Sequence, residues 1–203
     1  MNFTPRGTVY GTLLNFRGEV QAMAPQMHEA PYTAPPKAPI LYVKPANTWS
    51  ADNDDIPVPA RVAQVEIGAT LAMVMKAPGQ VAGYVLMNDL SVPHASFFRP
   101  PVKFKCLDGF LGIGSALADV DPVGLALEVR INGSLQQTVA FDRLVRDPQR
   151  LLADVSEFMT LQAGDMLMIG CDFPRPCAKV GDRIELSAPG LHMLTNTLVA
   201  QAL

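Results

Sequence analysis

The densest group of ionisable side chains lies in NDLSVPHASFFRPPVKFKCLDGF, residues 88–110. Asp89, Arg99, Lys105 and Asp108 occur within this stretch, and phenylalanine and proline separate them. A buried strand does not carry so many charges, and a disordered linker does not carry so many aromatic rings. The stretch therefore predicts the rim of a polar pocket with apolar walls. Its cations suit an anionic substrate, because Arg and Lys bind carboxylates.

Each of these charged residues also has a plain structural interpretation. Asp89 could be a turn residue after a strand, and Lys105 could be a solvated surface lysine. Arg99 offers bidentate recognition of a carboxylate, but it could instead pair with Asp108. Lys44, in LYVKP, could cap the strand that it follows or lie beside the pocket. We expect site roles for Asp89 and Lys105, and the pattern leaves both roles of Lys44 open.

Composition and motifs exclude several classes of function. The 203 residues are about half apolar and carry a formal net charge of -3, with Lys and Arg scattered, so no basic surface for nucleic acid or an anionic membrane is expected. The longest apolar run, residues 67–75, is far shorter than the roughly 20 residues of a membrane-spanning helix. Phosphate-binding glycine loops, H-E-x-x-H and G-x-S-x-G are absent from the sequence. Nucleotide chemistry and a serine nucleophile are therefore disfavoured.

The N-terminal sequence and the cysteines indicate the compartment. MNFTPRGTVYGTLLNF has no apolar region behind a basic start. Three cysteines without a C-x-x-C pair fit reduced thiols better than a disulfide framework or a zinc site. We expect a cytoplasmic protein with one domain over residues 1–203.

The elements that must position the charged residues are short. Eighteen prolines and fifteen glycines break up the chain, which favours strands and loops over long helices. Apolar residues recur near a period of 3.6 from Asp147 to Leu161 and predict one central helix. Strands are predicted over 62–75, 79–91, 163–170 and 180–199, and a hairpin over 125–141 with Asn132-Gly133 at its turn. The expected fold class is α+β, mostly β.

In their order along the chain, these segments resemble the fumarylacetoacetate hydrolase family. The resemblance rests on Asn15-Phe16, LYVKP at 41–45, GYVLMNDLS at 83–91, K-x-x-D-x-F at 105–110, the INGSLQQ hairpin and GDMLMIG at 164–170. It covers nearly the whole chain and implies the fold of that family's C-terminal domain, a mixed β-sheet roll or barrel with few short helices. RPPVKFKCLDGF most resembles the N-terminal, decarboxylase half of the two-part isomerase/decarboxylases of 4-hydroxyphenylacetate (homoprotocatechuate) breakdown.

This resemblance implies an enzyme that decarboxylates an unsaturated oxo-polycarboxylate, such as 5-oxopent-3-ene-1,2,5-tricarboxylate, or that isomerises its enol and keto forms. It implies catalytic roles for Asp89, Lys105 and Glu19, the last at the position of a lid histidine in the family. It implies substrate binding by Lys44, Arg99 and Asp108. The alternative is a catalytically reduced subunit that pairs with a metal-binding sister isomerase half. A homodimer is the other assembly that the resemblance suggests.

The resemblance also raises the question of a metal. The family pattern uses a Glu-x-Glu and an Asp to hold Mg²⁺ or Mn²⁺, which would chelate the carboxylate and oxo oxygens of the substrate. Asp89 matches the Asp, but Gly68 and Thr70 replace the two glutamates. Glu66 lies two residues earlier on the same strand face, so Asp89 and Glu66 are the candidate ligands and the case for a metal is weak. The family's T-G-T-P loop is replaced as well, by Ile169-Gly170-Cys171-Asp172.

Overall fold

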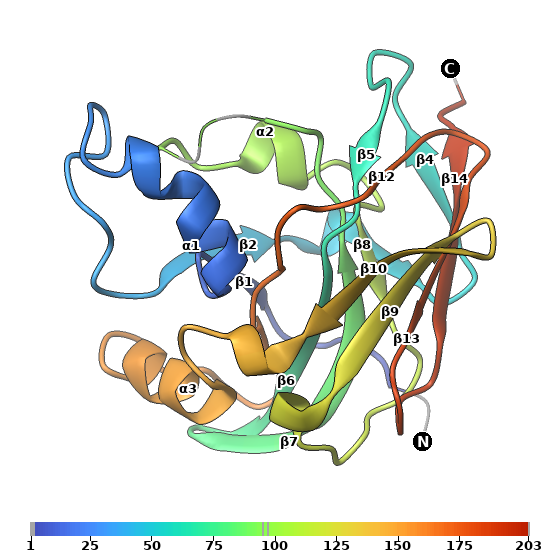
Figure 1. The fold of residues 1–203 in the computed structure, drawn as a ribbon. Coiled ribbons are helices and arrows are strands. Elements are labelled where there is room, and N and C mark those ends of the chain that lie inside the picture. The colour runs from blue at the N-terminus through green and yellow to red at the C-terminus, as the bar shows by residue number, and fades with distance from the viewer. Residues whose placement is uncertain (1–2, 95, 97, 203) are drawn as a thin grey trace.

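The computed structural model describes residues 3–94, 96 and 98–202, and these form two large β-sheets, one two-stranded sheet and short helices (Figure 1). The first sheet has the strand order β2-β1-β11-β6-β7-β8-β3. Its members are β1 (Val9–Leu13), β2 (Ile40–Lys44), β3 (Trp49–Ala51), β6 (Ala69–Ala77), β7 (Gln80–Asp89), β8 (Leu111–Ile113) and β11 (Met166–Met168). We refer to it as the main sheet.

The second sheet has the order β10-β9-β13-β14-β4. It contains β4 (Asp55–Val58), β9 (Ala126–Ile131), β10 (Ser134–Ala140), β13 (Arg183–Ser187) and β14 (Leu194–Ala200). Two short strands, β5 (Val65–Glu66) and β12 (Cys177–Ala178), pair with each other beside it. The sheets thus account for most of the regular structure, as the sequence predicts.

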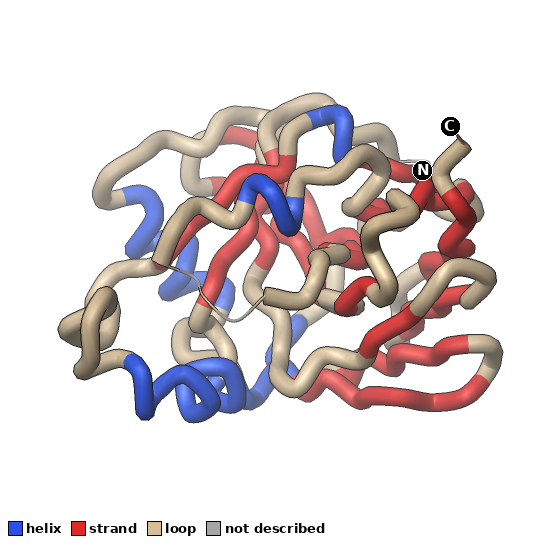
Figure 2. The backbone as a smooth tube through the Cα atoms, turned by 90° about the horizontal axis from the view of Figure 1, so that it is seen from above, coloured by secondary structure: helices blue, strands red, loops and turns tan. Residues whose placement is uncertain are grey.

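The helices are short and lie mostly on one side of the molecule. They are α1 (Arg17–Met23), α2 (Val102–Lys105), α3 (Pro148–Ser156) and the 3-10 turns Ala24–Gln26, Ala46–Thr48, Pro122–Gly124 and Phe141–Arg143. In Figure 1, α1, α2 and α3 lie opposite the second sheet, and Figure 2 shows the same separation from above for most of the helical segments. None of the helices in the described part of the chain is long and apolar enough to cross a membrane.

The apolar core has two parts. One fills the space between the two large sheets, and the other lies on the opposite face of the main sheet. Leu71 and Met73 of β6 face the large core that also contains Leu127 and Leu198 of the second sheet. The alternate residues of β6, Ala72 among them, face a smaller core under α1. A strand buried on both faces needs a continuous apolar run rather than alternation, which explains the pattern ATLAMVM.

The mostly β architecture with few short helices is confirmed, and several boundaries differ from the prediction. The helix at Pro148 ends at Ser156, earlier than Leu161. The segment 180–199 is a pair of antiparallel strands, β13 and β14, because the turn at Gly190, with φ of 78°, breaks it in two. The expectation of a single helix was wrong: α1 has seven residues and α2 has four, too few for a period of 3.6 to emerge.

Gly11 fixes the position of a tyrosine that enters the candidate site. Gly11 of β1 is the direct partner of Tyr42 in β2. A Cβ atom on Gly11 would lie 2.0 Å from Cζ of the Tyr42 ring, so the ring lies flat over the glycine. Only a residue without a side chain leaves that space.

Gly11→Ala is expected to destabilise the protein by about 1–3 kcal/mol, because the added methyl must displace the buried Tyr42 ring. Gly124→Ala is the matched control, since a Cβ there meets nothing within 4 Å. Both variants restrict the unfolded chain equally, so the difference between their free energies of unfolding in urea isolates the clash. Equal stabilities of the two variants would show that the ring does not need the glycine.

Candidate functional site

The candidate site is a buried ionic cluster at the ends of three elements. It contains one carboxylate, two ammonium groups and one phenol. Asp89 is the last residue of β7, Lys44 of β2 and Lys105 of α2. Lys105 Nζ donates to Asp89 Oδ2 over 2.6 Å, and Tyr42 Oη donates to the same oxygen. Lys44 Nζ lies 2.9 Å from Asp89 Oδ1. Tyr42, Lys44, Asp89 and Lys105 are named the inner cluster.

The curl of the main sheet brings the inner cluster together. β2 and β7 are four strand spacings apart in the sheet order, which is roughly 19 Å if the sheet were flat. Tyr42 and Lys44 point to one face of β2, since they are two residues apart on a strand. The contact between Lys44 and Asp89 therefore requires the sheet to curl into a half-barrel with these side chains on its inner side.

Lys44 has a different part in the cluster from Lys105. Lys44 Nζ donates to three backbone carbonyls, those of Leu90 at 3.1 Å, Lys105 at 2.5 Å and Phe110 at 2.6 Å. An ammonium group has three donors, so Lys44 has none left for a substrate. Lys44 thus holds three loop ends in place, which is not the substrate-binding role expected from the sequence.

Burial and the neighbouring charges shift the pKa values of the groups in the inner cluster. Burial raises the pKa of Asp89, but the ammonium groups of Lys105 and Lys44, with the hydrogen bonds from Lys105 and Tyr42, outweigh it and hold that pKa below its ordinary value. Burial and the Asp89 charge raise the pKa of Tyr42, which keeps its proton as a donor. Burial lowers the pKa of Lys44, and Asp89 opposes this effect. Asp89 is therefore a carboxylate at neutral pH.

A second ionic group lies under α1. Glu19 is the third residue of α1, where a glutamate can reach back to the chain before the helix, and its Oε2 accepts from Leu14 N over 2.5 Å. Its other oxygen accepts a hydrogen bond from Arg175 Nη2. Both side chains are buried, with 3% of Glu19 and 6% of Arg175 exposed. They line a cavity of about 210 Å³, named the outer cavity, together with Glu66, His94, Phe173 and three residues of α1 and its C-terminal side.

Gly68 and Cys171 lie beside the backbone of Asp89. A Cβ on Gly68 would lie 2.4 Å from the backbone oxygen of Asp89 and 3.0 Å from Cys171 Sγ. Burial raises the pKa of the Cys171 thiol to about 12, and the charges of Arg175, Asp89, Lys105 and Glu19 all act on it. Cys171 is therefore a neutral thiol within electrostatic reach of both groups, and it is not a nucleophile.

The donors around Asp89 do not fit Mg²⁺ or Mn²⁺. Both oxygens of Asp89 face ammonium groups, Gly68 has no room for a side chain, and Thr70 Oγ1 donates to the Gly170 carbonyl over 2.5 Å. Among the residues described, no three His, Cys, Asp or Glu side chains are grouped where they could hold a metal ion. Hard cations need several oxygen ligands. The geometry gives no support to the metal-ligand role predicted for Asp89 and Glu66.

Two predicted site residues lie outside this region. Asp108 is exposed, and its Oδ1 accepts from Asn47 Nδ2 over 2.7 Å. Arg99 is exposed at another depression, which Pro100, Val102 and Tyr42 of the inner cluster also line. Neither Asp108 nor Arg99 lines the outer cavity.

Two residues of the site were missed by the sequence analysis. Tyr42 could have been found from its spacing, because it shares a strand face with Lys44. Arg175 follows the loop that departs from the family's T-G-T-P pattern and lies between two prolines in FPRPC. That setting was its only signal.

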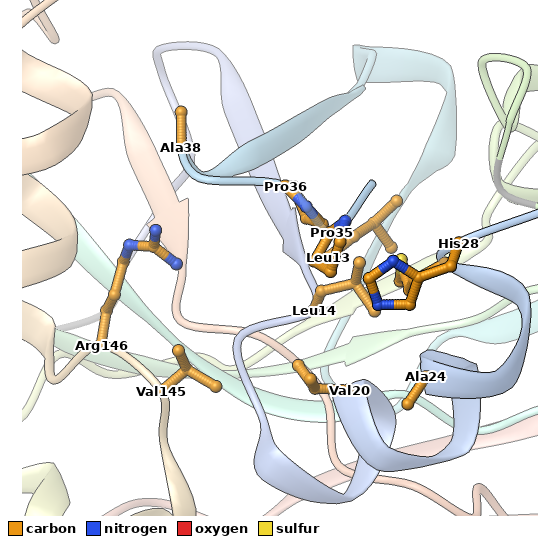
Figure 3. A pocket seen from close by; sticks show the side chains of 11 residues that line it. Leu13, Leu14, Val20, Ala24, His28, Pro35, Pro36, Ala38, Val145 and Arg146 are labelled. Carbon is orange, nitrogen blue, oxygen red and sulfur yellow. The ribbon is translucent and has the colours of Figure 1, made fainter. Parts of the chain in front are cut away.

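A third cavity has apolar walls and is no candidate for ionic chemistry. Figure 3 shows it between α1 and the proline-rich segment, with His28 at one end and Arg146 at the other. Arg146 is already engaged, because its Nε donates to Asp154 Oδ2 over 2.7 Å and its Nη2 donates to the carbonyl of Lys37. No residue of the inner cluster lines this cavity.

Comparisons with known proteins agree with the geometry. A family model described as Fumarylacetoacetate (FAA) hydrolase C-terminal matches residues 8–199. The 4-hydroxyphenylacetate degradation bifunctional isomerase/decarboxylase of Escherichia coli is 35% identical, over 96% of this chain and 47% of its own length. The homoprotocatechuate catabolism bifunctional isomerase/decarboxylase of Escherichia coli is 34% identical, over 96% and 48% respectively. This chain thus spans about half the length of these relatives.

A solved structure shows the same fold. The crystal structure of 5-carboxymethyl-2-hydroxymuconate delta-isomerase from Mycobacterium smegmatis matches with a TM-score of 0.79 and 24% identity. The match covers 97% of this chain and 80% of that one. The curled, mostly β fold expected from the sequence is confirmed by this likeness.

Asp89→Asn is expected to lower the free energy of unfolding by about 3–5 kcal/mol, because it leaves two buried ammonium groups without a counterion. Asp108→Asn makes the same chemical change at an exposed position and should cost no more than about 0.5 kcal/mol. Urea unfolding of the two variants and the wild type measures the difference. A loss below 1 kcal/mol at Asp89 would contradict the assigned ion pairs.

The stability that Asp89 contributes should depend on pH in a defined direction. Because its pKa is lowered in the folded state, the contribution is complete above the ordinary aspartate pKa of about 3.9. It is lost as the pH falls from there toward the folded-state pKa, since the unfolded chain takes up the proton first. The difference between the unfolding free energies of wild type and Asp89→Asn should stay constant from about pH 5 to 7 and shrink below about pH 4. A difference that grows in acid would refute this.

Proposed function

This chain belongs to the fumarylacetoacetate hydrolase family, and we propose that it decarboxylates an unsaturated oxo-polycarboxylate. Our candidate substrate is 5-oxopent-3-ene-1,2,5-tricarboxylate, in the breakdown of 4-hydroxyphenylacetate. Two relatives that cover 96% of the chain carry the name isomerase/decarboxylase, which supports this choice. An isomerase that interconverts enol and keto forms of the same carbon skeleton needs the same stabilised intermediate.

The chemistry places negative charge on one oxygen. In the candidate substrate, the carbon that bears the departing carboxylate is joined through a C=C bond to the oxo carbon. When its bond to that carboxylate breaks, carbon dioxide leaves and the electron pair moves through the C=C bond onto the oxo oxygen. A proton then adds to this dienolate oxygen and gives the dienol. The enzyme must therefore stabilise an oxyanion that forms only as the bond breaks.

One observation carries the proposal: Lys105 is a buried ammonium group with unused donors. Its side chain is 1% exposed, and among the described residues its hydrogen bond to Asp89 is the only one that its Nζ makes. Two of its three N–H groups are therefore available for the dienolate oxygen. The low dielectric of the interior strengthens that interaction, and Asp89 and the Tyr42 ring, 4.8 Å from Nζ, hold the ammonium in position.

The remaining residues receive supporting roles. Asp89 is the counterion that orients Lys105, and Lys44 keeps the three loop ends around it fixed. We assign Glu19 the relay of a proton from solvent to the dienolate oxygen, because it is the carboxylate of α1 that lines the outer cavity and can take up a proton there and pass it on. No step needs a metal ion, because Lys105 supplies the positive charge.

A second candidate function is that of a catalytically reduced subunit. It is favoured by Gly68 and Thr70 in place of carboxylates, and by the length of the relatives, of which this chain spans about half. In that case the chain would stabilise a sister isomerase half, or pair with a copy of itself. The purified chain alone would then be inert and gain activity only with the sister half. Turnover by the chain alone excludes this candidate.

Lys105→Met is expected to reduce the rate of carbon dioxide release by about 10²–10³-fold, the usual cost of removing an oxyanion donor. Lys103→Met, an exposed lysine in the same helix, is the matched control and should keep the wild-type rate. Circular dichroism of both variants checks that the fold is intact. A Lys105→Met protein that turns over the tricarboxylate at the full rate would overturn the proposed function.

A further inference from the structure

Arg175 is a buried cation whose donors are mostly unused. A guanidinium group has five N–H donors, and in the described part of the chain Arg175 uses one, for Glu19. Its Nε is buried without a hydrogen-bond partner. Its Nη1 lies 3.9 Å from Glu66 Oε2, too far for a hydrogen bond. Buried donors without acceptors are costly, so this group indicates a ligand that supplies several oxygens.

The chain around Arg175 holds it in a fixed position. Pro174 and Pro176 restrict the backbone on either side of it. The carbonyl of Pro176 accepts a hydrogen bond from Ile67 N over 2.9 Å, which ties the segment to the strand that leads into Gly68. Arg175 is thus presented to the outer cavity by a rigid segment, as a binding group must be.

The charges at the site balance without a metal ion. Lys44, Lys105 and Arg175 are the cations, and Asp89, Glu19 and Glu66 are the carboxylates around them. A divalent cation would add two charges to a region where two carboxylates of the family pattern are missing. The carboxylate beside the oxo group of such a substrate brings the planar pair of oxygens that a guanidinium binds in bidentate fashion.

We propose that Arg175 replaces a metal ion as the cation that binds the carboxylate beside the oxo group of the substrate, in the outer cavity. Glu19 is its counterion in the empty site, and the incoming carboxylate takes the place of Glu19 on the guanidinium. The oxo oxygen next to that carboxylate is then left for Lys105. This inference rests on the proposed function for the identity of the substrate, but the binding of a small dicarboxylate tests it separately.

Calorimetric titration of oxalate into the purified chain, in buffer with excess EDTA, is the test. The wild type is expected to bind oxalate, and Arg175→Lys to bind it at least about tenfold more weakly because lysine cannot form the bidentate pair. Glu19→Gln is expected to bind more tightly than the wild type, since the competing carboxylate is gone. A purely structural Arg175–Glu19 pair would not give this opposite response. Arg183→Lys, an exposed arginine, is the matched control.

Each outcome separates this inference from the proposed function. Absence of oxalate binding by the wild type, or unchanged binding by Arg175→Lys, overturns the role of Arg175. If the wild type still decarboxylates the tricarboxylate in EDTA, the proposed function survives that result. If oxalate binding depends on Arg175 but the chain does not turn over the tricarboxylate, the anion site is supported and the proposed decarboxylase function is overturned. Circular dichroism and the double variant Glu19→Gln/Arg175→Gln, which leaves no unpaired buried charge, show whether a loss comes from misfolding.

Discussion

The ion pair between Lys44 and Asp89 joins two strands that the order of the main sheet keeps four spacings apart. It can exist only if the sheet curls, and the apolar run of β6, buried on both faces, supplies layers of core on either side of that curl. The same lysine holds the carbonyls of Leu90, Lys105 and Phe110, so the loop ends that deliver Lys105 depend on it. Because a buried charge without a partner is expensive, the closure of the half-barrel and the ionisation of the site stabilise each other.

This coupling explains how a site can lose two carboxylates and remain charged. Asp89 is kept ionised by ammonium groups on either side, which leaves Lys105 with donors for an oxyanion. Gly68, at a position where the family pattern has a glutamate, is packed against the backbone of Asp89 and the thiol of Cys171, so the floor of the site is small and neutral. Charge stabilisation then falls to protein cations, of which Arg175 is the one with the most unused donors.

Local patterns predicted the strand that ends at Asp89. The four-residue helix that ends at Lys105 is too short to show a period, so Lys105 was predicted from the K-x-x-D-x-F segment alone. Arg99 and Asp108 lie in the same stretch of sequence but outside this helix, and both are exposed. Spacing places Tyr42 on the same strand face as Lys44, but neither its contact with Asp89 nor the role of Arg175 could be assigned in this way. Their roles depend on contacts across 156 residues with Glu19 and 47 residues with Asp89, which no local period encodes.

The central claim is that the positive charge of this site comes from the chain itself. Titration of Mn²⁺ into the purified chain, with and without oxalate, tests it most directly, with Asp89→Ala as the reference for specific binding. The account predicts that the wild type and Asp89→Ala show the same Mn²⁺ titration at every oxalate concentration, because Asp89 holds no metal ion. Stoichiometric Mn²⁺ binding that requires both oxalate and Asp89 would contradict it and would identify a metal site completed by the substrate.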